Sequence, residues 1–255
     1  VALRHAEIAL AEAKAEGGGR VRVFAPAMES RLARRLRIEA ALETGLDEGR
    51  FRLAFQPLVS PIDRAARGYE ALLRLEDVDG APIPPAEFIP LAEETGRIEA
   101  LGAWVLHEAA RIAAGWSLPL GVSVNLSVHQ FRDGRLVETV RAALAESGLD
   151  PRRLELEVTE SLVIRDPETV RRQLEELRAL GVGVAMDDFG AGHSSLAQLW
   201  RFRFDRLKLD RAFVQALCRD EPRARDVVAA VIALGHRLGM RVTAEGIETE
   251  AQARA

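Results

Sequence analysis

Seven polar residues stand at or near the ends of predicted strands, and together they have the chemistry of a metal site. They are Glu70, Asn125, Glu157, Asp187, Asp188, Lys208 and Glu245. Five carboxylates that faced one another would repel strongly without a cation. Carboxylate and amide oxygens are hard ligands, and no histidine or cysteine cluster offers a zinc site, so the set favours Mg²⁺ or Mn²⁺. The adjacent Asp187 and Asp188 can serve two ions, with one carboxylate bridging, at the separation of about 3.5 to 4 Å used for in-line displacement at phosphorus.

Each of these residues also has a purely structural explanation. Glu70 or Glu157 alone is more often half of an ion pair, and Asn125 a hydrogen-bonding residue at a strand end. Asp187 and Asp188, followed by Phe and Gly, can form a plain turn. The agreement of six strand ends is what favours one shared site.

The usage of lysine singles out Lys208. Of the 35 basic residues, Lys14 and Lys208 alone are lysine, and all others are arginine. Lysine carries a compact charge that can lose its proton, whereas arginine carries a planar and permanent one. Lys14, in a polar helical stretch, needs no functional explanation.

The elements that must position these residues alternate between strand and helix from Arg52 onward, which indicates parallel strands with crossover helices. The predicted strands are residues 52–59, 68–75, 120–126, 154–159, 182–187, 206–210 and 241–245. The predicted helices are residues 98–115, 135–147, 167–180 and 222–238, with Asp166 as the N-cap of the third and a further helix beginning in 248–255.

A closed barrel explains the polar strand ends better than an open sheet does. Six strands of an open sheet span about 24 Å, so their ends could not meet at one site. In a TIM barrel the C-terminal ends of several strands converge on the active site. We therefore expect an α/β fold of the TIM-like (β/α)8 type, with an eighth strand beyond Ala255.

Composition excludes several classes of function. The chain has 255 residues, 48% hydrophobic and 29% charged, with a formal net charge of −4. This charge argues against a DNA or RNA polymer as partner, because such binding needs a broad basic surface. A single cysteine, Cys218, and the lack of a long apolar run or signal peptide are typical of a cytoplasmic protein without a membrane segment.

The first 50 residues are predicted to lie outside the barrel domain. Residues 5–16 predict a helix, Val21 to Phe24 a strand, and Met28 to Leu46 a helical linker. We expect residues 1–27 to be the end of a preceding domain, residues 28–50 a linker helix, and residues 51–255 the barrel.

Seven segments carry a family resemblance that covers about residues 50 to 250. They are GYEALLR (68–74), EFIPLAEETG (87–96), NLS (125–127), ELEVTES (155–161), DDFGAGHSSL (187–196), LKLD (207–210) and AEGIET (244–249). In order and spacing they resemble the EAL-domain phosphodiesterases of the bacterial second messenger cyclic di-GMP. The resemblance implies a TIM-like barrel whose first strand is antiparallel, and a last strand, with a substrate-contacting glutamine, that lies beyond this chain. It also implies hydrolysis of cyclic di-GMP to linear pGpG by in-line attack of a metal-bound water, with Mg²⁺ or Mn²⁺ required and Ca²⁺ inhibitory.

The resemblance further implies roles for individual residues. Ligands of a first metal ion would be Glu70, Asn125, Glu157 and Asp187, and those around a second would be Asp187, Asp188 and Glu245. Lys208 falls beside the attacking water, and Gln56 and Arg74 match positions that touch the guanine and the phosphate. Glu160 matches a glutamate that steadies the loop after the aspartate pair, Glu248 matches a polar residue below the site, and His193 replaces the usual tyrosine.

The sequence leaves two alternative functions open. It also leaves open whether the protein forms a homodimer. The first is a module that binds cyclic di-GMP, or another protein, without cutting it; the complete set of metal ligands argues against it. The second is a TIM-barrel enzyme acting on another phosphorylated substrate, which only the family motifs exclude. Residues 5–28 resemble the last helix and strand of a GGDEF (diguanylate cyclase) domain, which implies a parent protein with two domains.

Overall fold

The computed structural model describes residues 1–15, 17–132, 134–159, 167–190, 199, 201–219 and 221–254. These residues form two compact units. The N-terminal unit comprises Val1–Arg52 and Arg74–Arg97, and the barrel unit comprises Leu53–Leu73 and Ile98–Ala255. None of the helices in the described part of the chain is long and apolar enough to cross a membrane.

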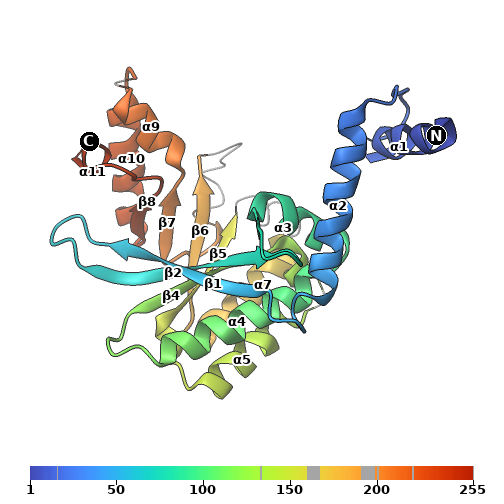
Figure 1. The fold of residues 1–255 in the computed structure, drawn as a ribbon. Coiled ribbons are helices and arrows are strands. Elements are labelled where there is room, and N and C mark those ends of the chain that lie inside the picture. Colours follow the sequence, from blue (N-terminus) through green and yellow to red (C-terminus); the bar gives the residue numbers. More distant parts are fainter. Residues whose placement is uncertain are drawn as a thin grey trace. The chain divides into compact units, whose positions relative to one another are not determined.

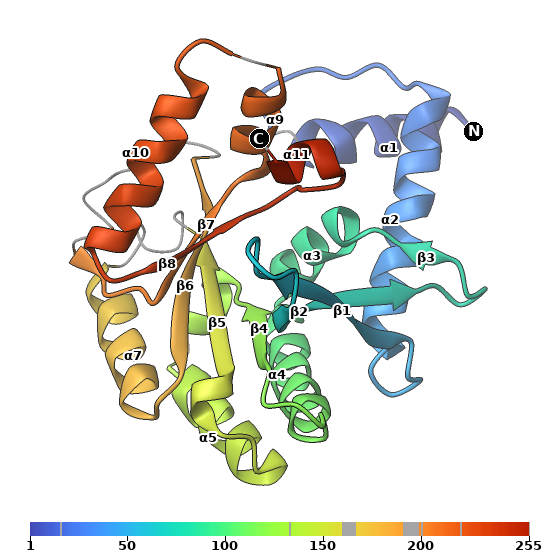
Figure 2. The same cartoon turned by 90° about the vertical axis from the view of Figure 1, so that its left-hand side faces the viewer.

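One curled sheet positions the candidate site, and its parallel strands follow chain order (Figures 1 and 2). The strands along it are β1 (Phe51–Val59), β2 (Ala66–Glu76), β4 (Gly121–Asn125), β5 (Leu154–Thr159), β6 (Gly183–Phe189), β7 (Arg206–Leu209) and β8 (Arg241–Ala244). From β2 to β8 each strand pairs in parallel with the next. β1 forms a hairpin with β2 and runs antiparallel, as the family resemblance implied (Figure 1). All seven predicted strands are thus confirmed, and the α/β barrel-type fold with them.

Helices follow the strands and pack on the outside of the sheet. α4 (Ile98–Ala114) contacts β4, α7 (Pro167–Ala179) contacts β6, and α10 (Ala224–Arg237) contacts β8. The other helices of the barrel unit are η1 (Val128–Phe131), α5 (Leu136–Ser147), η2 (Pro151–Arg153), α9 (Arg211–Cys218) and α11 (Glu250–Arg254). The predicted helices are confirmed within two residues at their ends, except that the predicted N-cap Asp166 lies outside the described residues. Helix α9 was not predicted.

The alternation of side chains along β5 explains how carboxylates come to lie inside a parallel sheet. Leu154, Leu156 and Val158 are each at most 1% exposed and belong to the apolar core. Glu155 and Glu157, between them, are also buried but point to the other side of the strand. The outer face of the sheet is therefore apolar against the helices, while the inner face carries polar residues toward the C-terminal ends of the strands.

The N-terminal unit is built mostly from helices. Its elements are α1 (Ala2–Ala15), α2 (Pro26–Thr44), β3 (Pro82–Ile83) and α3 (Pro85–Glu94). α1 and α2 share a small apolar cluster that includes Ile8 and Met28. The predicted strand from Val21 to Phe24 is wrong, because these residues have no partner strand and Val21 is 92% exposed. The boundaries predicted at residues 27 and 50 stay predictions.

Candidate active site

The side chain of Lys208 is the centre of the candidate site. It projects from β7 and is 1% exposed. Its Nζ lies 2.5 Å from Oε2 of Glu157 and 3.2 Å from Oε2 of Glu70. It also lies 2.7 Å from Oε1 of Glu245 and 3.1 Å from Oδ1 of Asp187. Side chains from β2, β5, β6, β7 and the end of β8 therefore meet around one ammonium group. The sequence predicted that these strand ends converge, but around metal ions and not around Lys208.

Asn125 joins this cluster through a hydrogen bond. Its Nδ2 donates to Oε1 of Glu70 at 2.8 Å. Asn125 is also the register partner of Glu157 on the next strand, so the two side chains lie on the same face of the sheet. Glu70 is thus held from two sides, by the amide of Asn125 and by the ammonium of Lys208.

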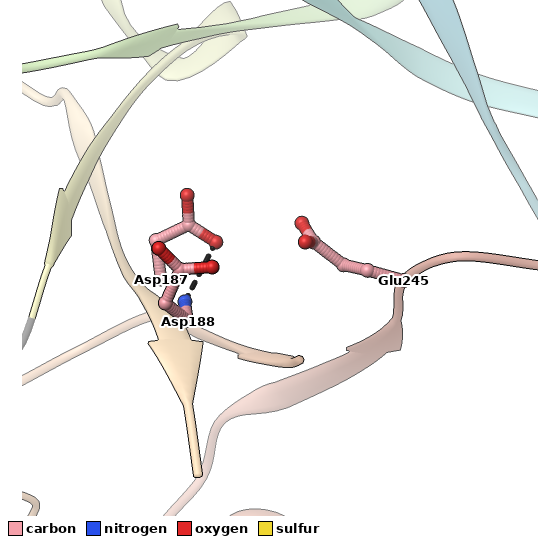
Figure 3. Close-up of side chains that lie close together, drawn as sticks. All are labelled: Asp187, Asp188 and Glu245. Atoms are coloured by element: carbon pink, nitrogen blue, oxygen red, sulfur yellow. Dashed lines mark hydrogen bonds between the residues drawn. The ribbon is translucent and has the colours of Figure 1, made fainter. Parts of the chain in front are cut away.

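An irregularity in strand β6 explains how two consecutive aspartates point toward the same site. In a regular strand Asp187 and Asp188 would point to opposite faces. The register of β6 against β7 shifts between Met186 and Phe189, and Asp188 has a positive φ of 54°, which is uncommon for a residue other than glycine. The backbone N–H of Asp188 donates to Oδ1 of Asp187 at 2.9 Å. Both carboxylates consequently lie near Glu245, each with an oxygen within 4.8 Å of the others (Figure 3).

Burial and mutual repulsion change the acidity of the cluster. Burial raises the pKa of Glu157 to about 8 and that of Glu245 to about 7, although the charge of Lys208 opposes both shifts. Burial, followed by the charge of Asp187, also raises the pKa of Asp188. For Lys208 burial disfavours the charged form, but the surrounding carboxylates outweigh it and raise the pKa above the ordinary lysine value. The single ammonium therefore does not offset the burial that favours the protonated forms of Glu157, Glu245 and Asp188.

The donor set fits a hard divalent cation. The side chain of Glu157 is almost fully buried. Its Oε1 has no hydrogen-bond partner among the described residues. A buried acceptor without a partner is costly, and a cation would satisfy it. The carboxylates of Asp187, Asp188 and Glu245 are close enough together to share an ion. Oxygen ligands of this kind suit Mg²⁺ or Mn²⁺ better than a soft metal.

Three further predicted residues lie outside this cluster. Gln56 is exposed on β1, and Arg74 is half-buried on β2, in the part of that strand that belongs to the N-terminal unit. Glu248 is exposed after β8, and its backbone N–H donates to Oε1 of Gln252 at 2.6 Å. Glu160 and His193 lie outside the described residues.

A second polar layer lies beneath the site, on the strand faces that sequence periodicity already marks as polar. Glu155, two residues before Glu157, accepts a hydrogen bond from Nε of Arg206 at 2.6 Å and another from Arg241 at 2.9 Å. Ser123 also donates to it, at 3.3 Å. The signal in the sequence is that Glu155 and Arg206 each precede a site residue by two positions and so share its face of the sheet. This layer connects β4, β5, β7 and β8 below the carboxylates.

Comparison with known protein families gives a match over most of the chain. A family model described as EAL domain matches residues 39–255. The curated relatives that the chain matches are longer proteins, of which the chain spans about a third.

Two of the relatives have names that state an activity. MucR of Pseudomonas aeruginosa, a bifunctional diguanylate cyclase/cyclic di-GMP phosphodiesterase, is 40% identical over 252 residues, which are 97% of this chain and 37% of MucR. PdeR of Escherichia coli, a cyclic di-GMP phosphodiesterase, is 34% identical over 250 residues, 97% of this chain and 38% of PdeR. The solved structure of the PaMucR phosphodiesterase in complex with c-di-GMP aligns with a TM-score of 0.79 and 41% identity, covering 85% of this chain and 89% of that one.

Proposed function

The chain belongs to the EAL domain family, and from this premise we propose that it is a metal-dependent phosphodiesterase that hydrolyses cyclic di-GMP to linear pGpG. One observation carries the proposal. Five carboxylates and one amide converge at the C-terminal ends of the strands around the buried ammonium of Lys208. Related proteins with the name of cyclic di-GMP phosphodiesterase support the choice of substrate.

We propose that two ions bind in this cluster. Glu70, Asn125, Glu157 and Asp187 would hold the first, and Asp187, Asp188 and Glu245 the second. When bound, such ions neutralise charge on the phosphodiester and make a coordinated water more acidic. Asp187 is the residue common to both sets.

Lys208 has the geometry of a group that holds the attacking water. Its Nζ donates to Glu157 and to Glu70, which fixes the ammonium at the centre of the carboxylates. The third N–H faces Oε1 of Glu245 at 2.7 Å, and it would turn to a water beside the phosphodiester once Glu245 holds an ion. The raised pKa keeps this group a donor in the metal-free protein. Gln56 and Arg74 would contact the guanine and the phosphate of the substrate, as the family resemblance implies.

The rival function is binding of cyclic di-GMP without cleavage. The charge of the site disfavours it: a phosphodiester anion would be repelled by an acidic cluster whose single ammonium does not balance it. Binding at this place already needs cations, and Mg²⁺ or Mn²⁺ between an oxygen-rich site and a phosphodiester also promotes its hydrolysis. Catalysis therefore explains the complete carboxylate set better than binding without cleavage does.

The experiment is an assay of the full-length protein with cyclic di-GMP under four conditions: Mg²⁺, Mn²⁺, Ca²⁺ and excess EDTA. We expect pGpG with Mg²⁺ or Mn²⁺ and no product with EDTA. Ca²⁺ should permit binding only, because it is larger and accepts more ligands in a looser geometry than Mg²⁺ does. Full activity in EDTA, or binding with no product under any condition, would overturn the proposal.

A further inference from the structure

The first turn of helix α9 lies against both chain segments that leave the candidate metal site. α9 begins at Arg211, three residues after Lys208, and Asp210 caps it by accepting a hydrogen bond from the N–H of Ala212 at 2.8 Å. The helix therefore follows directly from the strand that carries the central ammonium. Its first residues are not part of the proposed metal or substrate contacts.

Gly190, the last described residue after the aspartate pair before residue 199, packs against Phe213. Gly190, two residues after Asp188, has a positive φ of 96°, and a Cβ atom at this position would lie 2.1 Å from Cε2 of the Phe213 ring. The ring is thus in direct contact with the Gly190 backbone, and no larger residue fits there. The backbone N–H of Asp210 also donates to the carbonyl of Phe189 at 3.2 Å.

Gly246, which follows Glu245, packs closely against Arg211. Gly246 has a positive φ of 71°, and a Cβ atom there would lie 2.4 Å from Cβ of Arg211. The N–H of Glu245 donates to the carbonyl of Leu209 at 3.0 Å. One turn of helix therefore contacts Gly190, two residues after Asp188, and Gly246, directly after Glu245.

These contacts matter because β6 and β8 are not neighbours. β7 separates them in the sheet, so no ladder hydrogen bond sets the distance between Asp188 and Glu245 directly. Their carboxylates must nevertheless stay within 4.8 Å if one ion is to be shared. The first turn of α9, which follows β7, bridges this gap because it contacts both Gly190 and Gly246.

We propose that the first turn of α9 positions the second cation site, with Phe213 fixing the end of β6 and Arg211 fixing the end of β8. The inference rests on the proposed function, since it presumes that Asp187, Asp188 and Glu245 bind an ion. Phe213 and Arg211 are positioning residues, because they act through the backbone of Gly190 and Gly246.

The test measures the affinity of the full-length protein for Mn²⁺ by titration calorimetry, without substrate. Phe213→Ala should weaken Mn²⁺ binding by about 10-fold, the lower part of the range found when supports of metal ligands are removed. Phe213→Leu, which keeps most of the volume, should lose less. Val214→Ala is the matched control: Val214 is 4% exposed on the same helix, so its truncation lowers the unfolding temperature but should leave Mn²⁺ affinity unchanged.

A second variant guards against the case in which Phe213→Ala does not fold. Gly246→Ala changes an exposed turn, so the core stays intact, and its new Cβ must displace Arg211. We expect weaker Mn²⁺ binding and faster amide hydrogen exchange at Glu245 and Gly246. The added strain of alanine at positive φ acts in the same direction.

The outcomes separate the two proposals. If the unsubstituted protein binds no Mn²⁺, the metal site of the proposed function is wrong and this inference falls with it. If it binds Mn²⁺ and Phe213→Ala and Gly246→Ala bind equally well, the inference alone is wrong. Equal losses in Phe213→Ala and Val214→Ala would also overturn it, because the effect would then come from general destabilisation.

Discussion

Replacing Lys208 with methionine should destabilise the metal-free protein and leave the metal-bound protein nearly unchanged. Methionine has a similar length but no charge, so the substitution removes the ammonium without creating a large cavity. Lys208 is 1% exposed, and its Nζ lies 2.5 to 3.2 Å from four carboxylates. Without it, these carboxylates would face one another with no cation.

The size of the effect follows from the cost of an unpaired buried charge. Removing one partner of a buried ion pair costs about 3 to 5 kcal/mol. In a domain of this size each kcal/mol lowers the unfolding temperature by about 2 to 4 °C, so the expected loss in EDTA is about 6 to 20 °C. Because burial raises the pKa of Glu157 to about 8, the carboxylates can take up protons instead. Rising pH removes those protons, so the deficit should grow between about pH 6 and pH 9.

Divalent ions should restore most of this loss, since they supply the missing positive charge. The assay is thermal unfolding, followed by tryptophan fluorescence, in EDTA and in saturating Mn²⁺. Lys14→Met is the control, because it makes the same chemical change at an exposed position and should be neutral in both buffers. An equal loss with and without Mn²⁺, or no loss in EDTA, would refute the reasoning.

Three further predictions concern catalysis and folding. Asp187→Asn should lower the turnover of cyclic di-GMP more than Arg74→Ala, because Asp187 is the ligand common to both proposed ions; comparable kcat values would contradict the two-metal assignment. Lys208→Arg should be nearly as inactive as Lys208→Ala while still binding cyclic di-GMP, because the site encloses a point charge and arginine is planar and larger; near-normal turnover would show that charge alone suffices. Asp77→Asn should lower the urea midpoint at pH 7, and by less as the pH falls below the ordinary carboxyl pKa of 3.8: backbone hydrogen bonds, first from Ala81, lower the pKa of Asp77, so its stabilising effect is present above the ordinary pKa and is lost as the pH falls through the lowered one. A constant difference across this pH range would argue against a titrating contribution.

The sequence predicted which side chains converge because strand periodicity and strand ends determine the face and the edge of the sheet on which they lie. Glu70, Glu157 and Lys208 follow the rule that polar residues at the C-terminal ends of parallel strands meet on one face. The antiparallel first strand came only from the family resemblance, since periodicity does not reveal direction.

The errors came from features that depend on tertiary context. Val21 to Phe24 has the composition of a strand but finds no partner to pair with, so the segment is irregular. The bulge that turns Asp188 toward Asp187 depends on the register between β6 and β7, which no local pattern encodes. The hydrogen bonds from Arg206 and Arg241 to Glu155 depend on how β5, β7 and β8 are arranged in the sheet, which periodicity along one strand does not reveal.

The most direct test of the proposed function is to follow the oxygen that enters the product. The full-length protein and Asp187→Asn are incubated with cyclic di-GMP and Mg²⁺ in ¹⁸O-labelled water, and the products are weighed by mass spectrometry. We predict that the unsubstituted protein forms linear pGpG with one ¹⁸O in its terminal phosphate and that Asp187→Asn forms little or none. Cyclic di-GMP that stays bound and uncut by both proteins would contradict the assignment as a phosphodiesterase.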